Sequence, residues 1–210
     1  MAEIIYFTNA RLSFPNLVEA KAFQDGGTKK FSADLIIPKT DPQFAAFMGA
    51  VGKVASEEWR EHATAVLQNC QANRKLRCYG AGEEKVNQTT FAVYEGYPEM
   101  YYVSASADEA HPPQFINAAG KVAEGIERAE LGRKFYGGCY VNAAVRVWPQ
   151  NNSYGKGMRA QLIALQFAKD GEPFGEAVPD FSAMFGAVAG APAAAAPAAA
   201  APGLPPFMMP

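Results

Sequence analysis

A strict two-residue alternation between Gly137 and Trp148 constrains the fold more than any other feature of the sequence. The odd positions are small or β-branched and apolar: Cys139, Val141, Ala143, Val145 and Val147. Successive side chains of a β-strand point to opposite faces, so the segment predicts a strand with one face in a core. The even positions include Tyr140, Asn142, Arg146 and Trp148, an unusual set for a merely solvated face.

The rest of the body also predicts mostly strands, at residues 4–12, 31–38, 76–79, 100–106 and 158–167. In residues 31–38, Phe31, Ala33, Leu35 and Ile37 alternate with Ser32 and Asp34. A turn is expected at residues 13–16, and a mobile polar loop at residues 149–157.

One long helix interrupts the strands. Asp41 is a good N-cap and Pro42 suits the first helical position. Apolar residues then recur at helical spacing from Phe44 to Leu67, through Trp59. This stripe predicts a helix packed on the sheet as part of the core.

The last 35 residues differ in composition from the body, since 20 of them are Ala or Pro and none is Lys or Arg. We therefore expect a domain at residues 1–175 and a disordered tail at residues 176–210. Residues 181–185 and 207–210 are short apolar motifs in this tail. They are candidates for docking replication or recombination proteins.

Several classes of protein are disfavoured. The N-terminus lacks the pattern of a signal peptide and no apolar run can span a bilayer, so a cytoplasmic protein without a membrane partner is expected. Three cysteines without a C-x-x-C pair, and only His62 and His111, predict no disulfide framework, metal site or cofactor. No arrangement of residues predicts catalysis, so an enzyme is not expected.

The stretch from Leu131 to Lys169 carries six basic residues, six aromatic residues and no acid. The chain has 19 basic and 21 acidic residues, but three of the acids follow residue 170 and no basic residue does. Residues 1–170 therefore carry a net charge of +1, and binding of a polyanion must come from a local patch. Aromatic rings that stack on bases, beside cations that neutralise phosphates, are typical of single-stranded nucleic-acid binding.

Each candidate residue has an expected role. Trp148, Tyr140 and Tyr154 are candidates for stacking on bases, and Asn142 for a hydrogen bond to sugar or base. Arg146, Lys156 and Arg159 are expected to contact phosphates, while Arg133 and Lys134 steer the strand. Tyr102 and Arg77 are weaker candidates that would extend the track. The loop at residues 149–157 is expected to fold over a bound strand.

Four segments in a fixed order resemble a family of bacteriophage single-stranded DNA-binding proteins. They are residues 11–17 (RLSFPNL), 31–39 (FSADLIIPK), 137–143 (GGCYVNA) and 166–173, where Gln166-Phe167 precedes Asp170-Gly171-Glu172-Pro173. The resemblance implies a mainly β, OB-fold-like five-stranded barrel that coats and protects single-stranded DNA in phage replication or recombination. Such proteins often end in an acidic tail with a terminal aromatic residue, whereas this tail holds only Glu176 and Asp180.

Two alternatives remain open. The aromatic face can instead serve a protein-interaction or assembly factor, and the protein can instead bind RNA or anneal strands. The sequence also leaves the oligomeric state open, a homodimer included.

Overall fold

The computed structural model describes residues 2–22 and 26–175. Its strands are β1 (Glu3–Lys21), β2 (Lys30–Pro38), β3 (Tyr79–Ala81), β4 (Met100–Asp108), β5 (Gln114–Ile116), β6 (Tyr140–Asn152) and β7 (Gly155–Lys169). Its α-helices are α1 (Pro42–Trp59), α2 (Ala63–Ala72) and α3 (Gly125–Lys134), and short 3₁₀ turns cover Arg60–His62, Arg74–Leu76 and Gly82–Glu84.

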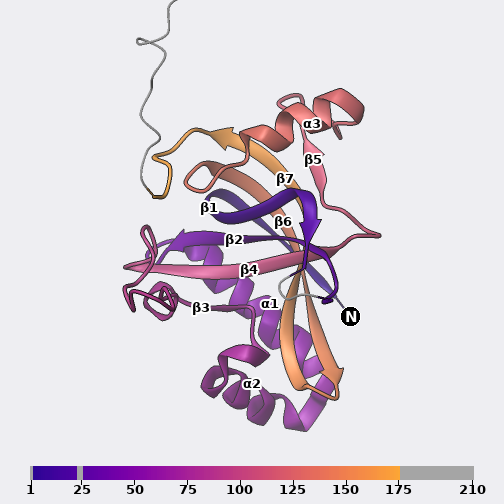
Figure 1. The fold of residues 1–210 in the computed structure, drawn as a ribbon. Coiled ribbons are helices and arrows are strands. Elements are labelled where there is room, and N and C mark those ends of the chain that lie inside the picture. Colours follow the sequence, from indigo (N-terminus) through magenta and orange to yellow (C-terminus); the bar gives the residue numbers. More distant parts are fainter. Residues whose placement is uncertain (1, 23–25, 176–210) are drawn as a thin grey trace, which may run out of the picture. The chain divides into compact units, whose positions relative to one another are not determined.

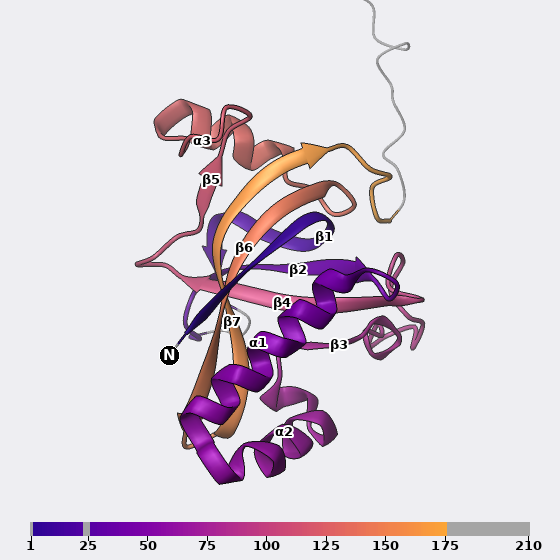
Figure 2. The same ribbon diagram turned by 180° about the vertical axis from the view of Figure 1, so that it is seen from behind.

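Backbone pairing closes five of the strands into a barrel, and these strands can be followed in Figures 1 and 2. The sheet has the order β3-β4-β2-β1-β6-β7-β5, and an additional parallel pairing of β4 with β7 joins its two halves. The ring is therefore β1-β2-β4-β7-β6, while β3 and β5 extend the sheet outside it. This arrangement confirms the expected mainly β, OB-fold-like five-stranded barrel.

The core follows the predicted alternation. Cys139, just before β6, and the odd-numbered side chains of β6 from Val141 to Val147 are all buried, as are Phe31, Ala33, Leu35 and Ile37 in β2. Ala144 is buried as well, next to a register irregularity in which the extra residue belongs to β7.

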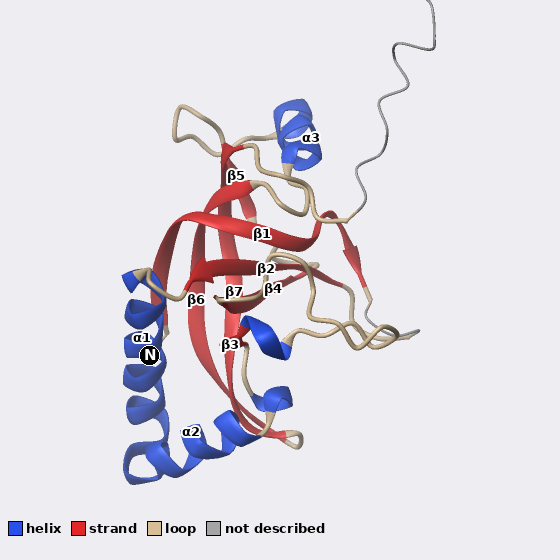
Figure 3. Ribbon diagram, turned by 90° about the vertical axis from the view of Figure 1, so that its left-hand side faces the viewer, coloured by secondary structure: helices blue, strands red, loops and turns tan. Residues whose placement is uncertain are grey.

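The predicted long helix is present, with a break. Asp41 caps α1 by accepting a 2.8 Å hydrogen bond from the Gln43 backbone N–H. Arg60 then takes a φ of 48°, and a 3₁₀ turn redirects the chain into α2. Figure 3 shows α1 lying along the barrel and α2 turning beneath it.

Two predictions about loops were wrong. The expected turn at residues 13–16 is a bulge within the continuous strand β1, where the register with β2 shifts between Ser13 and Asn16. The expected loop at residues 149–157 is a hairpin in which β6 and β7 pair out to Asn152 and Gly155. Because paired backbone fixes these residues, the segment is a projecting two-stranded arm rather than a loop that folds over a ligand.

The helix α3 and the strand β5 were not predicted. Residues 131–134 end α3 instead of opening a sheet segment, so Arg133 and Lys134 lie on a helix. None of the helices in residues 2–22 and 26–175 is both long and apolar enough to cross a bilayer. The predicted tail at residues 176–210, with its two apolar motifs, lies outside the described residues.

Candidate nucleic-acid interface

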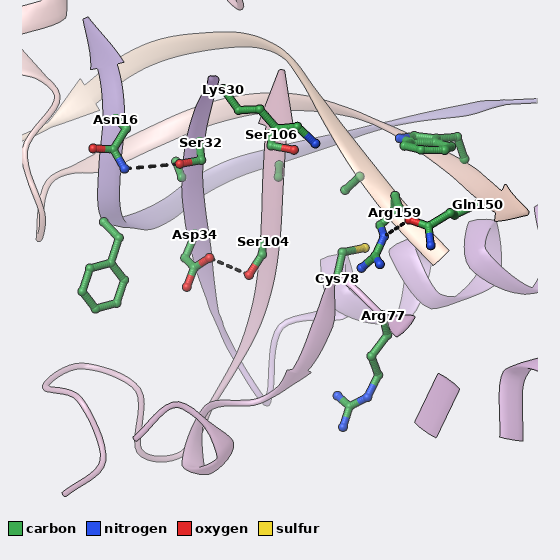
Figure 4. Close-up of a pocket in the computed structure, with 15 residues that line it drawn as sticks. Asn16, Lys30, Ser32, Asp34, Arg77, Cys78, Ser104, Ser106, Gln150 and Arg159 are labelled. Carbon is green, nitrogen blue, oxygen red and sulfur yellow. Dashed lines mark hydrogen bonds between the residues drawn. The ribbon is translucent and has the colours of Figure 1, made fainter. Parts of the chain in front are cut away.

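A groove of about 610 Å³ lies on the outer face of β2 and β4. Small side chains form its floor, and the close-up in Figure 4 shows Ser32, Asp34, Ser104 and Ser106 side by side on the two strands. Its lining comprises Phe14, Asn16, Lys30, Ser32, Ala33, Asp34, Arg77, Cys78, Ser104, Ala105, Ser106, Trp148, Gln150, Arg159 and Ala160. The strand order places β1 at one side of this floor and the β6–β7 hairpin at the other.

Strand register aligns five polar side chains in a row across the barrel. Asn16 pairs with Ser32, Ser32 with Ser106, Ser106 with Gln161, and Gln161 with Arg146. Neighbouring strands lie about 4.8 Å apart, so this polar row is roughly 19 Å long. All five side chains are partly exposed, and they offer donors and acceptors on the outer surface.

The hairpin carries an aromatic residue and a cation to the edge of the groove. Trp148 of β6 is the cross-strand partner of Arg159 of β7, and 39% of Trp148 is exposed. The Arg159 guanidinium donates a 2.8 Å bond from Nε to Gln150 Oε1 and a 2.7 Å bond from Nη2 to the Lys75 carbonyl. A charged group held this way is oriented before any ligand arrives.

A glycine lets the hairpin approach the segment after α2. A Cβ atom at Gly157 would lie 2.5 Å from the Leu76 carbonyl oxygen, which is too close for any other residue. The close approach brings the Lys75 carbonyl within reach of Arg159.

A second hollow of about 370 Å³ adjoins the first, since both are lined by Lys30, Ser106 and Trp148. It adds Arg146, whose Nη1 donates a 3.3 Å bond to Gln161 Oε1. Among the described residues, no ion pair involves Lys30, Arg146 or Arg159. Their positive charges therefore remain available to an anion.

Two acids line the hollows, and each has a partner. The buried carboxylate of Asp34 accepts bonds from Lys85 Nζ (2.7 Å), Ser104 Oγ (2.6 Å) and Tyr97 Oη (2.7 Å). Burial, and next the Asp34 charge, raise the pKa of Tyr97, so its hydroxyl stays a donor. The His111 ring beside Asp108 lowers the pKa of that carboxyl. Asp108 therefore stays ionised, and the lining of the two hollows is cationic because Lys30, Arg146 and Arg159 outnumber this carboxylate.

The structure places two predicted site residues inside the protein. Arg77 is buried, and its guanidinium donates to the Cys70 and Tyr79 carbonyls and pairs with Glu84 at 2.8 Å. Tyr102 is also buried, and Lys85 Nζ lies 4.4 Å from the centre of its ring. Arg77 borders the groove with its charge paired to Glu84, and Tyr102 does not line the groove.

Other predicted residues lie outside the groove. Tyr140 and Asn142 occupy the opposite end of β6, where Lys169 Nζ lies 4.6 Å from the Tyr140 ring and Asn142 donates to Gln166. Tyr154 and Lys156 are exposed near the hairpin tip. Arg133 and Lys134 are on α3, which Figure 1 shows beside β5. Arg146, Trp148 and Arg159 are the predicted residues that come together.

Sequence reasoning missed most of the floor. Ser32, Ser104 and Ser106 carry little chemical signal individually. The alternation of Ser104 and Ser106 with buried Val103, Ala105 and Ala107 is the pattern that marks their face.

In the described part of the chain, no group of three or more His, Cys, Asp or Glu side chains can hold a metal ion.

A closed five-stranded barrel whose second and third strands carry a cationic groove defines the class of OB-fold binding proteins, which bind oligonucleotides and oligosaccharides on this face. Within that class the chain belongs to the family described as the single-stranded DNA-binding protein of Enterobacter phage Enc34, whose model matches residues 3–189.

Individual relatives agree with this membership. Protein p50 of Acyrthosiphon pisum secondary endosymbiont phage 1 is 31% identical over 172 residues, covering 81% of this chain and 85% of that protein. The single-stranded DNA-binding protein of bacteriophage Enc34, solved in complex with single-stranded DNA, is 25% identical with a TM-score of 0.65, over 82% of this chain and 89% of that one. The single-stranded DNA-binding protein gp2.5 of bacteriophage T7, at 15% identity and a TM-score of 0.51, covers 90% of this chain and all of that one, and shares the fold.

Proposed function

We propose that this chain is a non-catalytic protein that binds single-stranded DNA along the groove over β2 and β4, and that it coats such DNA in phage replication or recombination. The observation that carries the proposal is the polar row, flanked by Trp148, in a member of this phage family. We place the protein in the cytoplasm of the infected host cell.

In the proposed mechanism, cationic side chains contact the phosphates and an aromatic ring contacts the bases. Lys30, Arg146 and Arg159 neutralise phosphates, since none of them is used in an ion pair among the described residues. The exposed indole of Trp148 stacks on a base, which tolerates any sequence because every base has a π-face. Ser32 and Ser106 keep the floor low and offer hydroxyl groups to sugars or bases.

The other residues predicted from the sequence have different roles in this proposal. Tyr154 and Lys156 can extend the path beyond the hairpin. We assign Arg77 and Tyr102 to the support of the groove rather than to contact with DNA. We leave Tyr140, Asn142, Arg133 and Lys134 out of this path, because they line neither of the two hollows.

The test is a titration of the full chain with oligo-dT at two salt concentrations, followed by intrinsic tryptophan fluorescence. We expect quenching and an affinity that falls with salt, with a log–log slope of about −0.7 for each phosphate contact. Duplex DNA of the same length is the control. No binding at low salt would refute the proposal.

Three further measurements test the alternative functions: binding of a protein partner, competition by poly-U, and the rate of strand pairing. Binding of a protein partner through the aromatic face with little salt dependence identifies an interaction factor. Displacement of oligo-dT by an equal amount of poly-U, or acceleration of strand pairing, identifies an RNA-binding or annealing protein.

A further inference from the structure

We infer that Phe14 is a second base-stacking platform, on the side of the groove opposite Trp148; the inference rests on the proposed function. Phe14 lines the groove and is 47% exposed, although it is a large apolar residue. It belongs to β1, and Trp148 belongs to β6. β1 pairs with the floor strand β2, whereas β6 forms a hairpin with β7, which pairs with the floor strand β4.

The backbone of β1 is bent to bring this ring outward. Phe14 has a φ of 46°, in the left-handed region that a bulky side chain rarely adopts. The register of β1 with β2 is lost between Ser13 and Asn16, so Phe14 sits in the bulge. Because Leu12, Ser13 and Leu17 remain buried, the irregularity exposes Phe14 while the strand on either side stays in the core.

Two tyrosines hold the ring in place. Tyr94 makes an edge-type contact with Phe14 at a centroid distance of 4.9 Å and an interplanar angle of 77°. The ring centroid of Tyr97 lies 6.3 Å from that of Phe14. The Tyr97 hydroxyl donates a hydrogen bond to Asp34 at the floor of the groove. A non-glycine residue keeps such a conformation only when its surroundings determine it, and these contacts supply that constraint.

The arrangement resembles what a stacking site requires. An exposed ring with few accessible rotamers loses little freedom when a base stacks on it. Asp34, Tyr97 and Lys85 would then act as positioning residues, because their hydrogen bonds hold the segment that supports Phe14.

The test compares the Phe14→Ala variant with the unaltered protein on two ligands, oligo-dT and an abasic oligonucleotide of equal length. We expect the substitution to weaken oligo-dT binding by about 5- to 150-fold, the range for loss of one stacked base. Binding of the abasic strand, and the slope of affinity against salt, should stay unchanged because the charges remain. The matched control is Phe91→Ala, since Phe91 is also exposed with a positive φ but does not line the groove.

The outcomes separate the role of Phe14 from the proposed function. Equal oligo-dT affinity in Phe14→Ala, or an equal loss on both ligands, overturns the role of Phe14 while the proposed function stands. Failure of the unaltered protein to bind oligo-dT overturns both. If Phe14→Ala does not fold, Phe14→Trp in a Trp148→Phe background replaces it: quenching of the new indole by oligo-dT supports stacking, and its absence refutes it.

Discussion

Trp148 and Arg159 are direct partners across the β6–β7 hairpin, so a ring and a positive charge share one edge of the groove. The side chain of Arg159 is held by Gln150 and by the Lys75 carbonyl. A nucleotide at this edge would meet a stacking surface and a phosphate contact in a fixed relation to each other.

Replacing Trp148 by Ala should weaken oligo-dT binding by about 1–3 kcal/mol, or about 5- to 150-fold, because one stacked base is lost. Trp148→Phe should lose less, since a ring remains. It should also abolish most fluorescence quenching, because Trp59 is buried in α1. Tyr140→Ala, at the far end of β6, is the control. Full quenching in Trp148→Phe would contradict stacking at this position.

Replacing Arg159 by Gln should reduce the salt slope of oligo-dT binding by about 0.7, because one phosphate contact disappears. Arg146→Gln should act in the same way. Arg133→Gln and Lys134→Gln remove the same charge from α3 and should leave the slope unchanged. Titrations at four or more salt concentrations measure the slope. An equal effect of all four variants would mean that the overall charge, and not the groove, drives binding.

Replacing Arg77 by Met should lower the free energy of unfolding by about 3 kcal/mol, because Glu84 and the Cys70 and Tyr79 carbonyls lose a buried donor. Urea unfolding measures this change. The folded variant should bind oligo-dT within about twofold of the unaltered protein. A stable Arg77→Met variant with a reduced salt slope would instead give Arg77 a direct contact with phosphate.

Protonation of Glu83 at low pH should weaken the hydrogen bonds that its carboxylate accepts. The hydrogen bond from Lys39, and next two backbone N–H groups, lower the pKa of Glu83 to about 2. A carboxyl group whose pKa is lowered by folding stabilises the folded state above its unfolded pKa of about 4.3, and this contribution is lost as the pH falls toward 2. Urea midpoints should therefore fall less steeply between pH 5 and 2 in Glu83→Gln. Parallel curves for the two proteins would contradict the assignment.

The elements with a local period were predictable from the sequence. The alternation in β6 and β2 and the Asp41 cap of α1 depend on neighbours a few residues away. The polar row depends on register instead. Ser106 and Gln161 meet only because β4 and β7 pair in parallel, and a single sequence does not encode that alignment in any short pattern.

The roles of individual charges were less predictable. Arg77 and Arg159 look alike in the sequence, yet one is buried under carbonyl groups and the other lies at the rim. The exposure of Phe14 depends on a bulge that the pattern of residues 13–16 signalled as a turn. The chemistry of the site was therefore partly visible, but its geometry was not.

The barrel closes through two residue pairs, Ala105 with Ala160 and Ser106 with Gln161. This short parallel join is the smallest contact between neighbouring strands of the ring, and the polar row passes directly across it. DNA bound along the polar row would cross the β4–β7 pairing. Binding of DNA in the groove and closure of the barrel should therefore stabilise each other. Slower amide exchange at these four residues in the bound protein would record that coupling.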